Sequence, residues 1–484
     1  MKQSVYLTAL LLWMMCCSVA EAATKYVKTS CTNGITTYAP GADTCTGGSD
    51  TVYNSIANCL SGIVAGDTCS VRAGTYVVRI AAGAIPAGTS ETIRTTLQGY
   101  AGETVTLQPT GAGNVIDFAS PQQYITVDNV TLDAANTTSG IVFRIQNGAK
   151  YVNLTNSVVK NGKDSGIGVF MGTPTGTCCN KVSRTKIHNN GDSNLDHGVY
   201  FATDNNVVEY SEVHTNWSYG IQNYTGEGSQ AHHNTYRYNW VHDNSADGSN
   251  FYAGFIIGSG TNILVHNNLI VDNGRGIRAQ YGIGADSAEV YQNTIFSNTN
   301  ECILIAAETN SSLWKNNVCH SNGTKITDNG VSSTITNSLC ETTGSCGTSA
   351  QIQASATAVM LAPVSNSFSL VAGSLAIDNG AVISGGPAQS CSGCANGSAP
   401  DIGAFETFTF VAGNCTIPDT ANDNQFVINL TGNVAPFAPL YPAASCTGFT
   451  AKKNGANNVV TACSRTGDYQ ETITLTSAYI NGDT

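Results

Sequence analysis

An asparagine recurs about once every 25 residues through the middle of this chain. Segments 263–273, 288–298 and 312–322 each end on this asparagine, with another asparagine five residues earlier and an inward-type residue three residues earlier. Extended backward, the frame has spacings of 29, 26, 28, 29, 25 and 24 residues between Asn161, Asn190, Asn216, Asn244, Asn273, Asn298 and Asn322. A repeat of this length predicts a solenoid, in which each coil stacks on the next.

Asparagine suits this recurring position for two reasons. It tolerates the left-handed backbone conformation that a sharp bend requires. When coils stack, its side-chain amides can also hydrogen-bond from one coil to the next. We therefore expect these asparagines to be structural and not catalytic.

A glycine-led strand follows each of the first five recurring asparagines. Its pattern is glycine, apolar, variable, apolar, at 166–169, 198–201, 220–223, 254–257 and 276–279, with some substitutions. Because side chains alternate along a strand, the second and fourth residues should point inward and the third outward. The extra length lies between strands, at 173–180 and 245–252, which we expect to be loops on the rim.

Two further segments carry a family resemblance. AGDTCSVRAGTY (65–76) resembles the first coil of the right-handed β-helix proteins in the pectate-lyase-like superfamily of secreted bacterial proteins, although Ala65 replaces the usual proline. The stretch 375–406, which contains DIGAFE, resembles their closing segment. The resemblance covers roughly residues 25–406 and implies an all-β, single-stranded, right-handed parallel β-helix. It leaves the activity open among lyases, hydrolases, epimerases and binding proteins.

The chain divides into three parts. Residues 1–23 read as a secretory signal peptide, with Lys2, an apolar run over 5–15 and the A-x-A site at 20–22. Residues 24–406 form the expected β-helix with its N-terminal cap and closing segment. Residues 407–484 contain short alternating stretches, which predict a small β-sandwich-like module that stops soon after a strand.

Charge narrows the range of partners. Without Lys2 and Glu21, 20 basic and 32 acidic residues remain, so the net charge stays at −12. That balance disfavours nucleic acid and anionic membranes, and no apolar run is long enough to span a bilayer. We expect a secreted or cell-surface monomer whose partner is a polysaccharide. An acidic polysaccharide would need a local basic patch or a bridging cation.

Fifteen cysteines remain after the signal peptide, and an exported chain favours disulfides. Close spacing predicts four pairs: Cys31 with Cys45, Cys59 with Cys69, Cys340 with Cys346, and Cys446 with Cys463. Cys391 and Cys394 have a zinc-like spacing but lack a second pair, so a disulfide is the better interpretation. The odd count leaves one thiol over, and Cys319 is the candidate because its frame position points inward.

One outward face precedes the recurring asparagines. Three adjacent coils should align residues of the same frame position in columns: His188, His214 and His242; Lys186, Glu212 and Trp240; Arg184, Tyr210 and Tyr238. This face could bind a glycan, with Tyr210, Tyr238, Trp240 and His214 as contacts, or hold a metal. The alternative is that like residues simply stack on exposed strands.

The second outward face is the glycine-led strand, with the column Gly168, Tyr200, Gln222, Ile256, Arg278 and Leu304. Asp196 could orient His197 as a base, with Tyr200 or Tyr219 as proton donor. Gln222 and Arg278 are the candidate substrate contacts, since arginine is a good carboxylate binder. Arg278 lies three coils from Tyr200, roughly 14 Å by strand spacing, so we expect it to serve a neighbouring sugar.

No cofactor is firmly indicated. Asp164 and Asp196 share a frame position on adjacent coils and could hold Ca²⁺. The alternative is that both carboxylates cap turn amides.

Two functions remain open. The first is a polysaccharide lyase or epimerase that acts on a uronic-acid-containing polymer by proton abstraction. The alternative is a non-catalytic glycan-binding or structural repeat protein. An enzyme needs an acid, a base and a charge stabiliser within a coil or two, whereas a binding protein needs only aromatic columns.

Overall fold

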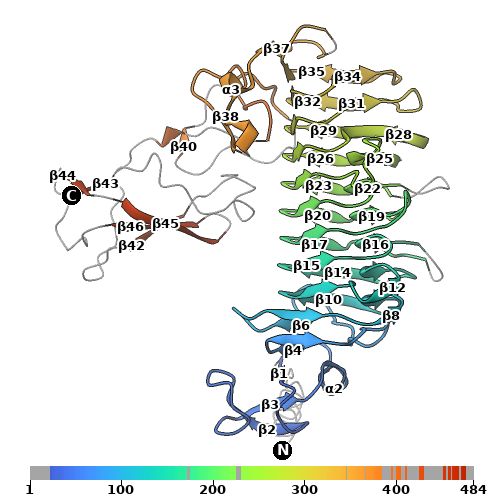
Figure 1. Ribbon diagram of the computed structural model, residues 1–484, viewed down its shortest axis with the longest axis vertical. Coiled ribbons are helices and arrows are strands. Elements are labelled where there is room, and N and C mark those ends of the chain that lie inside the picture. Colours follow the sequence, from blue (N-terminus) through green and yellow to red (C-terminus); the bar gives the residue numbers. More distant parts are fainter. Residues whose placement is uncertain are drawn as a thin grey trace, which may run out of the picture.

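The chain folds into a long stack of coils, with a cap at the N-terminal end and a closing segment beside the later coils (Figure 1). The computed structural model describes residues 22–404 apart from 172–174, 225–230, 345, 366, 384–393 and 396–398; beyond 404 it describes only short strands between 409 and 475. The predicted signal peptide lies almost wholly outside the described residues. Among the residues described, no helix is long and apolar enough to cross a membrane.

Three sheets run along the stack, and each coil from β10 to β34 contributes one strand to each. Sheet 1 has the spatial order β2 (Ile35–Tyr38), β3 (Asp50–Tyr53), β1 (Thr24–Val27), β4 (Thr68–Val71), β6 (Thr95–Gly99), β10 (Gln123–Asp128), β14 (Lys150–Thr155), β17 (Lys181–Ser183), β20 (Val207–Glu209), β23 (Thr235–Arg237), β26 (Leu264–His266), β29 (Glu289–Tyr291), β32 (Leu313–Lys315) and β35 (Thr334–Thr336).

Sheet 2 has the order β37 (Gln351–Ile352), β36 (Leu339–Cys340), β33 (Val318–His320), β30 (Thr294–Phe296), β27 (Leu269–Val271), β24 (Trp240–His242), β21 (Glu212–His214), β18 (Lys186–His188), β15 (Val158–Lys160), β11 (Thr131–Asp133), β7 (Val105–Leu107) and β5 (Gly74–Tyr76). Sheet 3 has the order β34 (Thr324–Asp328), β31 (Glu301–Ile305), β28 (Arg275–Asp286), β25 (Ala253–Thr261), β22 (Ile221–Asn223), β19 (Val199–Phe201), β16 (Ile167–Val169), β13 (Phe143–Ile145) and β9 (Ile116–Phe118).

Parallel pairing between coils gives the register that the sequence frame predicts. In sheet 3, for example, Gly168 pairs with Tyr200 and Tyr200 with Gln222. The apolar positions on either side of these residues are buried in one continuous core that runs from Val27 to Cys346. Period-two alternation therefore fills the interior of the stack, as expected for strands with one buried face.

Different elements cover the N-terminal end and the side of the later coils. At the N-terminus the antiparallel pair β2–β3 and helix α2 (Ile56–Gly62) cover the first coil, and Ser55 caps the helix through Asn58 N–H. Near the C-terminus, helix α3 (Ala356–Val359), the 3-10 turn η1 (Pro363–Ser365) and the antiparallel pair β38 (Met360–Ala362) and β39 (Ser367–Leu370) form a closing segment. A minor parallel pair joins β8 (Gly111–Ala112) and β12 (Thr137–Ser139).

Beyond residue 404 the described residues form only short strands, and the first of these pairs with β40 (Cys394–Ala395). They are β41 (Thr409–Phe410), β42 (Gln425–Asn429), β43 (Ala451–Lys453), β44 (Ala456–Asn458), β45 (Val460–Gly467) and β46 (Gln470–Leu475). They pair antiparallel as β40–β41, β42–β46–β45 and β43–β44. These short pairings do not define a sandwich, so the C-terminal module stays a prediction.

The asparagine ladder is confirmed from Asn190 to Asn322. Each side-chain amide donates to the next carbonyl oxygen along the stack, at Nδ2–Oδ1 distances of 3.0, 2.9, 3.0, 3.1 and 2.8 Å. A second ladder, Asn239–Asn268–Asn293–Asn317, has 3.0 Å at each step. Stacked amides thus satisfy buried backbone groups at two corners of the coil.

The predicted backbone conformation and the first member of the ladder were wrong. The left-handed residue is the one before each ladder asparagine, at φ of 51–57° for Asn189, Thr215, Asp243, Asp272, Ser297 and Ser321. Asn161 belongs to that left-handed column, with φ of 61°, because Lys160 pairs with His188. Gly162 occupies the ladder position instead, and its N–H donates to Asn190 Oδ1 at 2.9 Å.

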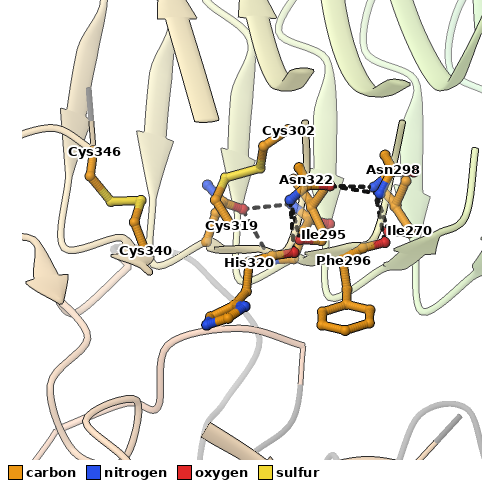
Figure 2. The surroundings of a disulfide bond; sticks show 12 residues. Ile270, Ile295, Phe296, Asn298, Cys302, Cys319, His320, Asn322, Cys340 and Cys346 are labelled. Atoms are coloured by element: carbon orange, nitrogen blue, oxygen red, sulfur yellow. Dashed lines mark hydrogen bonds between the residues drawn. A yellow bond between two sulfur atoms is a disulfide. The ribbon is translucent and has the colours of Figure 1, made fainter. Parts of the chain in front are cut away.

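Three of the predicted disulfides are confirmed: Cys31–Cys45, Cys59–Cys69 and Cys340–Cys346. The predicted free thiol was wrong, because Cys319 of sheet 2 pairs across the interior with Cys302 of sheet 3, beside the asparagine ladder (Figure 2). Close spacing could not reveal this pair, because its two side chains point into the interior from different sheets.

Adjacent Cys178 and Cys179 also pair. The pairs Cys446–Cys463 and Cys391–Cys394 each include a residue outside the described part. The five disulfides among the described residues suit an oxidising compartment, outside the cytoplasm.

Candidate functional site

The predicted imidazole column exists on the outer face of sheet 2. His188 stacks on His214 at 4.9 Å between ring centroids and His214 on His242 at 4.8 Å, with interplanar angles of 5° and 8°. Glu212 lies beside this column, with Oε1 at 3.2 Å from His242 Nε2 and Oε2 at 3.1 Å from Lys186 Nζ. Sequence register therefore predicted which side chains become neighbours on this face.

His214 and His242 have pKa values shifted in opposite directions. Burial and the charge of His242 lower the pKa of His214 to about 4. Burial also favours neutral His242, but hydrogen bonds to Asp243 and Glu212 outweigh it and raise the His242 pKa. Burial opposes ionisation of Glu212 as well, yet its bonds to His242 and Lys186 bring the Glu212 pKa down to about 2. The face therefore carries a His242–Glu212–Lys186 charge network.

The ring faces on which a sugar would stack are already covered. Tyr210 stacks on Tyr238 at 5.1 Å and 13°, and the guanidinium of Arg184 lies 5.4 Å from the centre of the Tyr210 ring. His266 packs edge-on against Tyr238 at 5.7 Å. These tyrosines lie where the frame predicts, but they contact neighbouring coils with the surfaces that carbohydrate stacking requires.

Trp240 marks the end of the open part of sheet 2. It stacks on His242 at 4.1 Å. It also packs against an apolar cluster in which Leu269, Phe296 and Val318 of sheet 2 are buried by Met360 and Phe368 of the closing segment and their neighbours. The closing segment therefore covers the later coils of this sheet and bounds any binding surface at Trp240.

Sheet 3 brings together a second group, which we call the sheet 3 cluster: His197, Tyr200, Tyr219, Gln222 and Arg278. The His197 ring centroid lies 5.5 Å from that of Tyr200 and 5.4 Å from that of Tyr219. Gln222 is the register partner of Tyr200 on the next coil. The two predicted proton donors and the predicted base therefore do converge.

His197 is almost fully buried, at 3% exposure, and burial lowers its pKa to about 3 against the smaller opposing effect of a hydrogen bond to Gln222. Its Nδ1 lies 2.5 Å from Ser218 Oγ. A histidine with this pKa stays neutral at pH 7 and is a weak proton acceptor. Burial of Tyr200 raises its pKa to about 12, so its phenol keeps its proton.

The expected Asp196–His197 pair does not form. Asp196 Oδ2 instead accepts from the Ser193 N–H at 2.9 Å and the Ser193 hydroxyl at 2.7 Å, which makes it a cap of its own turn. Ser218 takes the orienting position on the imidazole. The sequence frame places Ser218 beside His197 on the next coil, but it assigned Ser218 no role.

The expected calcium pair gains no further ligand. Asp164 and Asp196 are close enough that the charge of Asp196, after burial, raises the pKa of Asp164. Within the part of the chain that is described, no three His, Cys, Asp or Glu side chains are placed to hold a metal ion. Since Asp196 caps its turn, calcium binding by this pair stays an untested prediction.

Arg278 is closer to the cluster than strand spacing predicts. Its backbone lies two coils from Tyr219, but its long side chain brings Nη1 to 3.5 Å from Tyr219 Oη. Arg278 is 3% exposed and Tyr219 is 5% exposed. The predicted three-coil separation between the backbones of Arg278 and Tyr200 is confirmed, but the long side chain brings the guanidinium to the cluster, and which sugar it would serve stays a prediction.

The rim loop 245–252 covers this arginine. Its residue Phe251, which sequence reasoning missed, has the guanidinium carbon of Arg278 at 4.8 Å and that of Arg275 at 5.0 Å from its ring centre. Tyr252 of the same loop packs edge-on against Tyr219 at 5.0 Å. The loop and sheet 3 thus enclose the cationic side of the cluster.

Buried neutral histidines predict acid sensitivity. Burial lowers the pKa of His197 to about 3 and that of His266 to about 4. Histidine in the unfolded chain titrates near 6.5, so below that pH the unfolded state binds protons that the folded state excludes. Stability present at pH 7 is therefore lost as pH falls toward the folded pKa values.

At about 1.4 kcal/mol per pKa unit, each of the two histidines should remove about 3 kcal/mol by pH 4. Urea unfolding at pH 7 and pH 4 measures this loss, to which His214 also contributes because its pKa is lowered to about 4. His266→Gln should reduce the loss by about 3 kcal/mol. His242, whose pKa is raised, works in the opposite direction. Equal stability at the two pH values would contradict the assignment of these histidines as buried and neutral.

Comparison with known proteins identifies the fold. Residues 115–283 match the family model described as "Right handed beta helix region". A search of curated protein sequences found no match to the chain. The family model covers about a third of the chain, and it agrees with the coils that carry both faces described above.

Among solved structures, the crystal structure of pectate lyase Pel9A matches with a TM-score of 0.57 and 15% identity, over 80% of this chain and 97% of that one. Alginate lyase from Paenibacillus sp. str. FPU-7 matches with a TM-score of 0.42 and 12% identity, over 57% and 96% of the two chains. The GH136 lacto-N-biosidase from Eubacterium ramulus matches with a TM-score of 0.49 and 12% identity, over 68% and 65%. At 15% identity the likeness to Pel9A establishes a shared β-helix fold and leaves the reaction open.

Proposed function

We propose that this right-handed β-helix protein is exported and acts on a uronic-acid-containing polysaccharide, as a lyase or an epimerase, at the sheet 3 cluster. The 3.5 Å approach of Arg278 Nη1 to Tyr219 Oη carries the proposal. It places a permanent cation beside a phenol, with a neutral imidazole and a second phenol in ring contact. That set matches the needs of proton abstraction next to a carboxylate.

The arginine supplies the charge. A uronate carboxylate resists loss of the proton on the adjacent carbon, because the carbanion that forms adds a second negative charge. A guanidinium that binds the carboxylate stabilises this charge where it develops. The net charge of −12 gives no global attraction for such a polymer, so this local cation supplies recognition as well.

The geometry favours the tyrosines over His197 for proton transfer. His197, with a pKa of about 3, stays neutral, and its contact with Ser218 fixes the ring as a positioning group. Tyr219 is the better proton acceptor, because the guanidinium beside its oxygen stabilises the phenolate form, which takes the proton from the carbon and becomes the neutral phenol. Tyr200, protonated with a pKa of about 12, can donate to a leaving sugar oxygen in a lyase or to the opposite face of the carbon in an epimerase.

The alternative is a non-catalytic glycan-binding protein that uses sheet 2. The row of imidazole edges and the His242–Glu212–Lys186 network favour polar contacts there. This candidate has weaker support, because the faces of Tyr210 and the outer imidazole column pack on one another. Trp240→Ala tests it directly, since loss of glycan retention without any turnover would favour binding alone.

The test is a panel of alginate, pectate and glycosaminoglycans incubated with the full chain. We expect unsaturated uronate absorbance or a changed uronate composition on one polymer, and its loss in Tyr219→Phe. Tyr151→Phe is the control, because Tyr151 stacks on Tyr124 in a different part of the stack. No turnover of any polymer, with glycan retention that depends on Trp240, would replace the proposal with the binding alternative.

A further inference from the structure

One backbone carbonyl oxygen in the rim loop accepts hydrogen bonds from two arginines. Arg278 Nη1 donates to the carbonyl oxygen of Phe251 at 3.3 Å, and Arg275 Nη1 donates to the same oxygen. Both guanidinium groups also lie within 5.0 Å of the Phe251 ring centre. Two cations from one strand thus converge on a neutral acceptor that belongs to a loop.

A carbonyl is a weak match for this position. Hydrogen bonds from arginine to an anionic oxygen are about twice as strong as those between neutral groups. Arg275 also pairs with the Glu301 carboxylate, so one negative charge is already accommodated at the edge of the pair. An oxyanion in place of the Phe251 carbonyl would accept hydrogen bonds from both guanidinium groups and would add the negative charge that the carbonyl lacks.

The rim loop bends sharply along its length. Three of its residues have left-handed backbones, with φ of 73° at Ser245, 75° at Gly248 and 55° at Asn250. Phe251, near the tip, is 42% exposed although its ring contacts both guanidinium groups. The start of the loop is anchored by hydrogen bonds from the N–H groups of Ser245, Ala246 and Asp247 to carbonyls of the preceding coil. Near its tip, Asn300 Nδ2 donates to the Asn250 carbonyl at 2.8 Å.

We infer that Arg275 and Arg278 form an oxyanion-binding site that the rim loop closes with the Phe251 carbonyl, and that a ligand carboxylate displaces this carbonyl. The loop then competes with the ligand, so the affinity for free anions is lower than the arginine pair alone would give. The identity of the natural ligand, the carboxylate of a uronate, rests on the proposed function. The site itself rests on the two arginines and the loop.

Asn250 offers a matched pair of variants. Proline cannot adopt the left-handed conformation of this position, so Asn250→Pro should disfavour the closed loop. Glycine adopts it freely, so Asn250→Gly should keep the loop closed. Neither change touches an arginine.

The measurement is calorimetric titration of the full chain with galacturonate oligomers and, separately, with sodium sulfate at constant ionic strength. We expect Asn250→Pro to bind the oligomers about tenfold more tightly than Asn250→Gly, which should match the wild type. Arg278→Gln should weaken binding by at least about tenfold. Sulfate that binds as tightly as the oligomers would identify a general oxyanion site, and weaker sulfate would assign it to carboxylates.

Equal affinities in the two Asn250 variants would overturn the inference, whether or not Arg278→Gln folds. The outcome does not depend on turnover. Altered affinities without activity on any polymer would remove the proposed function and leave the anion site in place. Activity on a polymer together with equal affinities in Asn250→Pro and Asn250→Gly would keep the proposed function and remove the loop-closed anion site.

Discussion

Replacing Arg278 with glutamine is expected to lower kcat/KM on the uronate polymer by about 10²–10³-fold, the usual effect of removing one charge-stabilising donor. Glutamine can still hydrogen-bond the Phe251 carbonyl, but it has no charge with which to neutralise a substrate carboxylate. Arg278→Lys keeps the charge without the two-pronged geometry and should recover part of the loss. Steady-state rates on the polymer identified in the panel measure the effect.

Arg144→Gln is the matched control for this prediction. Arg144 lies on the same sheet in β13, where its Nη2 pairs with Asp117 Oδ2 at 2.7 Å, far along the stack from β28. We expect its kcat/KM to stay within about threefold of the wild type, as for a surface ion pair of small energetic weight. Equal losses in Arg144→Gln and Arg278→Gln would show a general effect on folding and not a catalytic contribution.

The second large effect concerns the asparagine ladder. Asn244 Nδ2 donates to Asn273 Oδ1, Val213 O and His242 O, each at 3.0 Å, and Asn244 Oδ1 accepts from the backbone and side chain of Asn216. Asn244→Ala leaves several of these buried partners unsatisfied at about 1–3 kcal/mol each. We therefore expect a loss of about 3–6 kcal/mol in the free energy of unfolding, measured by urea denaturation.

Asn189→Gly provides the contrast. Asn189 is exposed and left-handed, with φ of 56°, immediately before the ladder residue Asn190. Glycine accepts this conformation, so the change should alter stability by less than about 0.5 kcal/mol. Similar losses in Asn189→Gly and Asn244→Ala would mean that the amide stack contributes little and that any asparagine in the repeat is equivalent.

The fold was largely predictable because two periods agree along the chain. The coil period of the asparagines gives the stack, and the period of two within each strand gives the inward residues. Neither period identifies which of two adjacent polar residues bends the backbone, and so Asn161 was placed in the ladder although it lies one position before it. That distinction depends on hydrogen bonds to the next coil, which the sequence pattern does not contain.

The candidate site was predictable in its columns and not in its contacts. Register alone placed Tyr200, Gln222 and Arg278 in one outward column. It could not show that Arg278 reaches Tyr219, because side-chain length and rotamer decide that contact. The roles of Ser218 and Phe251 depend on how the rim segments fold back on the strands, and no repeat specifies their path.

Proton abstraction beside a carboxylate at the sheet 3 cluster is the central claim, and NMR of the polymer incubated with the protein in D₂O tests it most directly. We predict either an olefinic signal from an unsaturated uronate or deuterium at the carbon next to the carboxylate, and neither signal with Arg278→Gln. An unchanged polymer, or the same signal from wild type and Arg278→Gln, would contradict the claim.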